Sequence, residues 1–161
     1  MHPWADRLSS GSYTACGVTV RLPISPLLHT KRWGLPVNGA HSYGRAWVLE
    51  DSGAPSECAW LDATLPFDRP RQLEMFPFPH RLSLHAEVTG YSLGISLRME
   101  ATGGVAVPVC FGYRIYLQRG QPQDHGTIVL PARRRVATDA RLLPTGAIEP
   151  LEMRSSTLRG R

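Results

Sequence analysis

The side chains that could carry chemistry in this sequence are scattered, and none of them has the spacing of a metal or disulfide motif. Cys16, Cys58 and Cys110 lie far apart and are odd in number, so neither a CxxC metal site nor a disulfide framework is indicated. His29 and His41 stand on either side of Asn38. Isolated histidines of this kind are more typical of surface or packing positions than of catalysis.

Arginine is the abundant functional group. Of the 18 basic residues only Lys31 is a lysine, and the net charge of +5 comes from scattered arginines rather than from a nucleic-acid-binding surface. The one dense cluster, residues 133–135, is more typical of a solvated strand end than of a phosphate groove. Arg7 could hydrogen-bond hydroxyl groups, because a guanidinium presents several donors in one plane, or it could be a surface residue beside Asp6.

The composition favours an all-β protein. The 161 residues suffice for a single domain with a core, and we expect one domain over residues 1–161. Fifteen glycines and 14 prolines interrupt the chain so often that many short strands are favoured over long helices. No apolar run is long enough to span a membrane, and the N-terminus lacks a signal-peptide layout. With no disulfide framework, we expect a cytoplasmic location.

The strongest secondary-structure signal is a hairpin with period-two alternation. Residues 82–88 and 91–101 alternate apolar and polar side chains around a turn at Thr89 and Gly90, which predicts two antiparallel strands with one buried and one wet face. We further expect a hairpin over 12–22, strands over 45–50, 58–65 and 127–131, a helical turn within 68–75, a loop over 27–39 and a frayed tail over 152–161. Trp47 is expected to anchor the core.

The rest of the chain is organised around residues 103–117. A Gly-Gly turn precedes an apolar run that contains Pro108 and Gly112. Proline lacks a ladder donor and glycine has no side chain to pack, so this pattern predicts a bulged or edge strand. Such strands often aim a side chain into a cleft, and the side chain after Tyr113 is Arg114.

Four motifs in this order resemble the aldose 1-epimerase (galactose mutarotase-like) family. They are HPWADRL at 2–8, FPFPHRL at 76–82, VPVCFG at 107–112 and LPTG at 143–146, and the similarity runs from Met1 to about Leu151. The resemblance implies a partial antiparallel β-sandwich of the galactose mutarotase-like (supersandwich) type, a sugar ligand, and no metal or organic cofactor. It also implies truncation at both ends, with the early strands of the family absent.

The resemblance also assigns site positions. Arg7 matches an arginine that hydrogen-bonds sugar hydroxyls, and the two catalytic histidine positions of the family hold Asn38 and Arg114. Arg81 and His41 are candidates for the pocket rim, as is His80. The family's glutamate base and aspartate partner lie beyond the last residue here. Asparagine does not titrate and arginine stays protonated at neutral pH, so the catalytic residues are unknown and the expected site binds through hydrogen bonds.

Three functions compete. The chain is an aldose 1-epimerase with a substituted catalytic set, a non-catalytic carbohydrate-binding module, or an inactive truncated homologue. In each case we expect no nucleic-acid or membrane partner. A partial sandwich leaves sheet edges and an apolar face uncovered, so a homodimer that covers the open sheet is expected.

Overall fold

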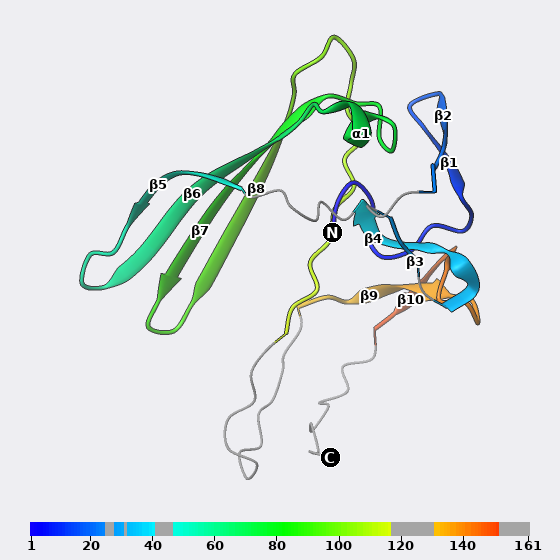
Figure 1. The fold of residues 1–161 in the computed structure, drawn as a ribbon. Helices are drawn as coiled ribbons and strands as arrows, with labels where there is room; N and C mark the ends of the chain where they lie inside the picture. Colours follow the sequence, from blue (N-terminus) through cyan, green and yellow to red (C-terminus); the bar gives the residue numbers. More distant parts are fainter. Residues whose placement is uncertain (25–27, 31, 41–46, 117–130, 152–161) are drawn as a thin grey trace. The chain divides into compact units, whose positions relative to one another are not determined.

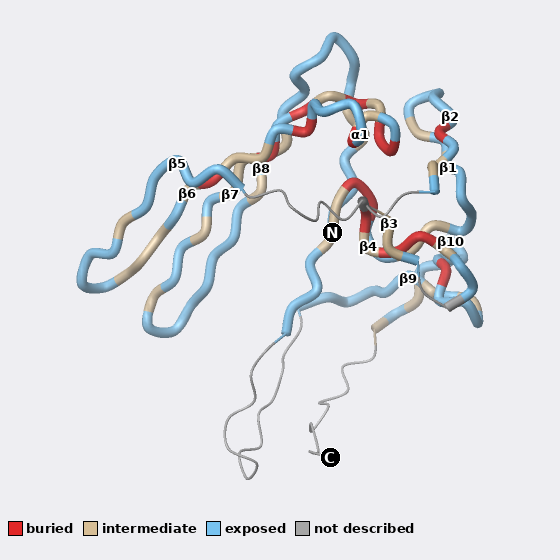
Figure 2. Tube along the Cα trace, viewed as in Figure 1, coloured by how far each residue is buried: buried red, intermediate tan, exposed pale blue. Residues whose placement is uncertain are grey.

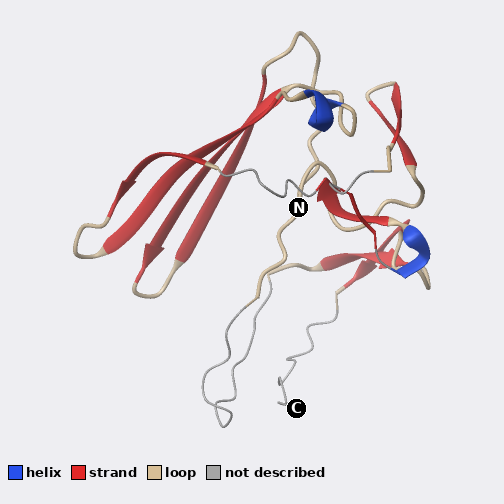
Figure 3. Ribbon diagram, viewed as in Figure 1, coloured by secondary structure: helices blue, strands red, loops and turns tan. Residues whose placement is uncertain are grey.

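The computed structural model describes residues 1–24, 28–30, 32–40, 47–116 and 131–151, and these residues form two compact units (Figure 1). The first unit comprises Met1–Gly112 and the second Tyr113–Arg161. Each is described by itself. Strands dominate both units, and all the paired strands named below are antiparallel (Figure 3). The all-β antiparallel class predicted from the sequence is therefore confirmed.

The largest element of the first unit is a four-stranded sheet in the order β5-β6-β7-β8. Its strands are β5 (Val48–Gly53), β6 (Cys58–Phe67), β7 (His80–Thr89) and β8 (Leu93–Ala101). The β7–β8 hairpin confirms the period-two prediction, and β6 confirms the strand predicted over 58–65. A short helix, α1 (Pro70–Leu73), connects β6 to β7 and confirms the predicted helical turn. The backbone N–H groups of Asp68 and Arg69 donate to Oε1 of Gln72, and these bonds cap the start of α1.

One face of this sheet is apolar, but only one end of it is buried (Figure 2). Phe67 and Leu82 are 4 % and 2 % exposed, whereas Leu93 and Ile95 are 66 % and 45 % exposed. The buried end is covered by Phe76 and Phe78, which cluster with Phe67. The prediction of one fully buried face was therefore wrong, because the residues that cover the sheet reach only the end where β6 and β7 connect through α1.

The N-terminal residues form two smaller hairpins. β1 (Ser12–Ala15) and β2 (Val18–Arg21) pair around Cys16 and Gly17, whose φ angles of 47° and 77° make the tight turn, and the hairpin predicted over 12–22 is confirmed. β3 (Leu28–Thr30), the 3-10 turn η1 (Arg32–Gly34) and β4 (Pro36–Ala40) follow. The predicted loop over 27–39 was wrong, because this stretch pairs its backbone despite lacking an alternating pattern.

Two other elements differ from expectation. Residues 45 and 46 of the strand predicted over 45–50 lie outside the described residues, and β5 runs from Val48 on to Gly53. Trp47 is 38 % exposed and is no core anchor. Residues 103–116 contain no strand, so the predicted bulged or edge strand was wrong within these residues. Gly112 instead exchanges two hydrogen bonds with Met1: its N–H donates to the Met1 carbonyl at 3.0 Å, and its carbonyl accepts from the Met1 amino group at 2.7 Å.

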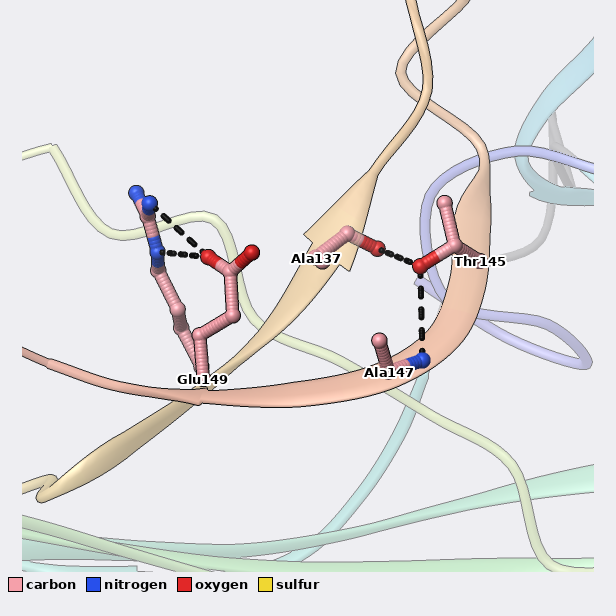
Figure 4. Close-up of polar contacts among 5 residues, drawn as sticks. Ala137, Thr145, Ala147 and Glu149 are labelled. Atoms are coloured by element: carbon pink, nitrogen blue, oxygen red, sulfur yellow. Dashed lines mark hydrogen bonds and ion pairs between the residues drawn. The ribbon is translucent and has the colours of Figure 1, made fainter.

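The second unit contains the hairpin of β9 (Arg134–Thr138) and β10 (Pro144–Pro150). A register shift follows Pro144, and Thr145 stabilises it: its hydroxyl donates to the Ala137 carbonyl and accepts from the Ala147 N–H (Figure 4). The exposed cluster at 133–135 lies at the start of β9 as predicted, and Arg135 pairs with Glu149 at 3.0 Å. In the connecting turn, the Leu143 N–H donates to Asp139 and lowers the pKa of that carboxyl.

All three cysteines are free thiols. No helix in the described part of the chain is long and apolar enough to cross a membrane. The cytoplasmic location, the single domain over 1–161 and the homodimer that covers the open sheet are untested. The strand predicted over 127–131 lies, except for its last residue, outside the described residues, and so does the tail at 152–161.

The N-terminal segment, residues 1–8, wraps around β4. His2 forms a parallel bridge with Gly39, and Arg7 forms an antiparallel bridge with Val37. The N–H of Leu8 donates to the Pro36 carbonyl at 3.0 Å. Trp4, 5 % exposed, packs between this segment and Met75 in the core cluster. Gly39 permits the close approach, because it has a φ of 79° and no Cβ facing the His2 backbone.

Replacing Gly39 by alanine should therefore destabilise the fold. A Cβ at this position would lie 2.1 Å from the His2 carbonyl oxygen, and the positive φ adds strain. We expect Gly39→Ala to lower the free energy of unfolding by about 2–4 kcal/mol, measured by urea denaturation. Gly94→Ala is the matched control, because nothing lies within 4 Å of a Cβ built there. Equal stability of the two variants would contradict the close approach.

Candidate functional site

The wrapped N-terminal segment brings Arg7 next to Asn38. Arg7 is paired with Val37 on β4, and the next residue along β4 is Asn38. The backbone N–H of Asn38 donates a hydrogen bond to the Asp6 carbonyl. Two residues that are about thirty positions apart in the sequence are thereby held on adjacent backbone segments. Both residues belong to the sugar-binding set expected from the sequence, and their role in that set stays a prediction.

Backbone strain concentrates at the same place. Asp6, Trp33 and Asn38 have φ angles of 58°, 73° and 63°, a region that side chains other than glycine seldom adopt. Such residues cost about 1–3 kcal/mol each and persist only where the surrounding structure enforces them, as it often does at binding and active sites. Asparagine and aspartate tolerate this region better than tryptophan does, so Trp33 is the most strained of the three.

The polar atoms of the pair are partly withdrawn from solvent. Asn38 Oδ1 is buried and has no hydrogen-bond partner among the described residues, and Arg7 Nε is also buried. An unpaired buried carbonyl oxygen costs about 1–3 kcal/mol, so a donor delivered to this oxygen would be bound favourably. Val37, which is 2 % exposed, fixes the backbone between the two.

An aromatic ring borders the pair. The Arg7 guanidinium carbon lies 5.4 Å from the centre of the Trp33 ring, within the range of a cation–π interaction, and Trp33 remains 46 % exposed. An amide oxygen, a guanidinium and an exposed aromatic ring together suit a ligand that carries hydroxyl groups on an apolar frame. Sequence reasoning missed Trp33. Its position before Gly34 was visible, but its left-handed backbone was not.

The other predicted site residues are not gathered here by the described structure. Arg81 is exposed on β7, paired between Pro66 on β6 and Glu100 on β8. Arg114 is exposed and belongs to the second unit, so its predicted place beside Arg7 stays a prediction. His41 lies outside the described residues. His80 is no rim residue: it is 1 % exposed, because it faces the aromatic core on the opposite face of β7 from Arg81.

A hollow of about 310 Å³ lies on the polar face of the four-stranded sheet, and none of the predicted site residues is among the residues that line it. Its polar side chains satisfy one another: His85 pairs with Asp62 at 2.8 Å and Thr64 donates to Glu50 at 2.5 Å. The His85 and Asp62 side chains are 47 % and 44 % exposed, so this face is a solvated sheet surface. Within the described ranges, no three metal-ligating side chains meet in a cluster.

The comparison with protein families agrees with the motifs. The family model described as aldose 1-epimerase matches residues 1–159 of the 161. The chain belongs to the aldose 1-epimerase family. Aldose 1-epimerases are β-sandwich proteins, which agrees with the antiparallel sheets of both units. Neither the curated proteins nor the solved structures included a significant match to the chain.

Because Asn38 has a positive φ, replacing it by glycine and by alanine distinguishes the strain of its backbone from the contribution of its side chain. Asn38→Gly should leave the free energy of unfolding unchanged or raise it by up to about 1 kcal/mol, because glycine accepts this φ and the buried unpaired oxygen is removed. Asn38→Ala should lower it by about 1–2 kcal/mol, because alanine is strained there. Thermal unfolding of both variants checks this, and an alanine variant as stable as the glycine variant would contradict the assigned conformation.

Proposed function

We propose that this aldose 1-epimerase family member binds aldose sugars at the site formed by Arg7 and Asn38, with Trp33 at its border. The observation that carries the proposal is the buried Oδ1 of Asn38, which lacks a hydrogen-bond partner within the described part of the chain and lies on the strand that pairs with Arg7. A sugar hydroxyl is both donor and acceptor. It can donate to Oδ1 of Asn38, which gives that oxygen a hydrogen bond, while it accepts from the guanidinium of Arg7.

The border of the site suits the rest of a pyranose ring. Aldoses expose C–H groups between their hydroxyls, and an aromatic ring such as that of Trp33 can pack against them. Arg81, His41 and Arg114 extend the proposed binding set through the family resemblance. Arg114 would supply further donors where the family has a histidine.

We propose binding without efficient turnover by these residues. Anomer interconversion needs a general base at the anomeric hydroxyl and a general acid at the ring oxygen, each contributing about 10²–10⁴ in rate. The family histidine positions hold Asn38, which does not titrate, and Arg114, which stays protonated up to about pH 12. Neither side chain can exchange a proton with a sugar at neutral pH.

Binding is tested by saturation-transfer NMR with galactose, glucose and their phosphorylated forms. Asn38→Gly and Arg7→Ala should each lower the affinity for the sugar about 5- to 10-fold, which is the effect of losing one net hydrogen bond. Arg98→Ala is the matched control, because Arg98 is an exposed arginine on the far sheet and its contact with Glu100 is a loose 3.9 Å. A wild-type protein that contacts none of these sugars would overturn the proposal, as would variants that bind like the control.

Turnover is tested by polarimetry on freshly dissolved α-galactose and α-glucose. The rotation should relax at the rate seen in buffer alone, because the Asn38 and Arg114 side chains transfer no protons at this pH. A saturable acceleration that is abolished by Asn38→Gly would show that the chain is catalytic after all. The binding proposal would survive that result, since the same site would then hold the substrate.

A further inference from the structure

His2 and His80 meet in the aromatic core of the first unit. Their Nε2 atoms are 2.8 Å apart, although the residues are separated by 78 positions in the sequence. His80 is 1 % exposed, and its ring stacks on Phe67 with the ring centres 4.6 Å apart. Phe76 packs edge-to-face with both imidazoles, and its ring centre lies 5.7 Å from the centre of each.

The outer nitrogen of each imidazole faces a backbone carbonyl. Nδ1 of His80 lies 2.6 Å from the Phe78 carbonyl oxygen, and Nδ1 of His2 lies 3.2 Å from that of Cys110. A carbonyl oxygen only accepts hydrogen bonds, so both Nδ1 atoms must carry a hydrogen. A neutral imidazole carries a single N–H. If both rings were neutral, two bare Nε2 lone pairs would therefore face each other at hydrogen-bonding distance.

The three contacts need three protons, one more than two neutral rings carry. We propose that His2 and His80 bind this additional proton together, held between their Nε2 atoms as an imidazole–imidazolium pair, in the acidic range below neutrality. The pair then donates both Nδ1–H bonds and one N–H···N bond. The stacked face of Phe67 supports the single positive charge by a cation–π interaction. A bridging zinc ion, at about 2.0–2.1 Å from each nitrogen, would push the nitrogens further apart than 2.8 Å.

The surroundings oppose positive charge on the pair, and a second proton would in addition be repelled by the first. Burial, then the neighbouring His80, lowers the pKa of His2 to about 4, and burial also lowers the pKa of His80 from its ordinary value. The Met1 amino group adds a further unfavourable positive charge from the N-terminal side. Cys110, whose carbonyl accepts from His2, also carries a thiol, and this residue is exposed. Phe67 and Phe76 on the remaining sides do not titrate.

The shared proton would fasten the N-terminal segment to β7 in a pH-dependent way. His2 belongs to the segment that wraps β4, and His80 is the first residue of β7. Between about pH 4 and 6.5 the folded pair would hold one proton where two independent histidines would hold two. This proton-binding site involves neither Arg7 nor Asn38, so it stands or falls independently of sugar binding.

The direct test is NMR of the full-length, chelator-washed protein with ¹⁵N-labelled histidine at pH 5.5. We expect a scalar coupling between Nε2 of His2 and Nε2 of His80, with a hydrogen on both Nδ1 atoms. His80→Gln should abolish the coupling, and His85→Gln, which alters an exposed histidine, should leave it intact. Two independently protonated rings, two bare Nε2 atoms, or a signal that depends on added Zn²⁺ would overturn the proposal.

The number of bound protons provides a second test. Well below the ordinary histidine pKa of about 6.5, the unfolded chain binds two protons at these histidines and the folded pair binds one, so stability falls as the pH falls towards 4. We compare the unfolding equilibrium constant of the wild type with that of the double variant His2→Gln/His80→Gln. Their ratio should rise about tenfold for each unit by which the pH falls. A hundredfold rise would mean that the folded pair holds no proton, and parallel profiles would mean that it holds two. Either result would refute the shared proton.

Discussion

The pairing of the N-terminal segment with β4 is the constraint on which the site depends. Four backbone contacts hold it: the bridges of His2 to Gly39 and of Arg7 to Val37, and the hydrogen bonds from Asn38 N–H to Asp6 and from Leu8 N–H to Pro36. These contacts require a residue without a Cβ at Gly39, because the His2 backbone occupies the space where one would stand. Arg7 is thus held beside β4 by main-chain pairing.

This pairing explains why strained and poorly satisfied groups collect in one place. The segment runs parallel to β4 at His2 and antiparallel to it at Arg7, so it must reverse direction between these residues. Asp6 in the segment and Asn38 on β4 both adopt left-handed conformations there. Burial of the Asn38 amide oxygen without a partner adds a further cost. The aromatic core beneath, where Phe67, Phe76 and the two histidines pack, supplies the stabilisation that offsets these costs.

Family membership tells what kind of protein this is, whereas the chemistry of the site residues bears on which reaction the chain can carry out. The family match over 1–159 establishes what kind of protein this is, and the antiparallel sheets agree with it. The family resemblance assigns Asn38 and Arg114 to the positions of the catalytic histidines, and we propose that this substitution limits the available proton transfers. Asn38 and Arg114 keep hydrogen-bonding capacity and lose titration near neutrality. Carbohydrate recognition can therefore outlast the acid–base reaction that the family name describes.

The sequence by itself determined the local elements and the family. Period-two alternation located β7 and β8, proline and the surrounding polar residues located α1, and four ordered motifs identified the family, because these signals depend on neighbouring residues. Only the tertiary structure decided that 28–40 is stranded, that 103–116 is not, that His80 is buried against His2, and that Trp33 borders the site. Each of these depends on backbone bonds or contacts between residues far apart in the chain, which leave no periodic trace in the sequence.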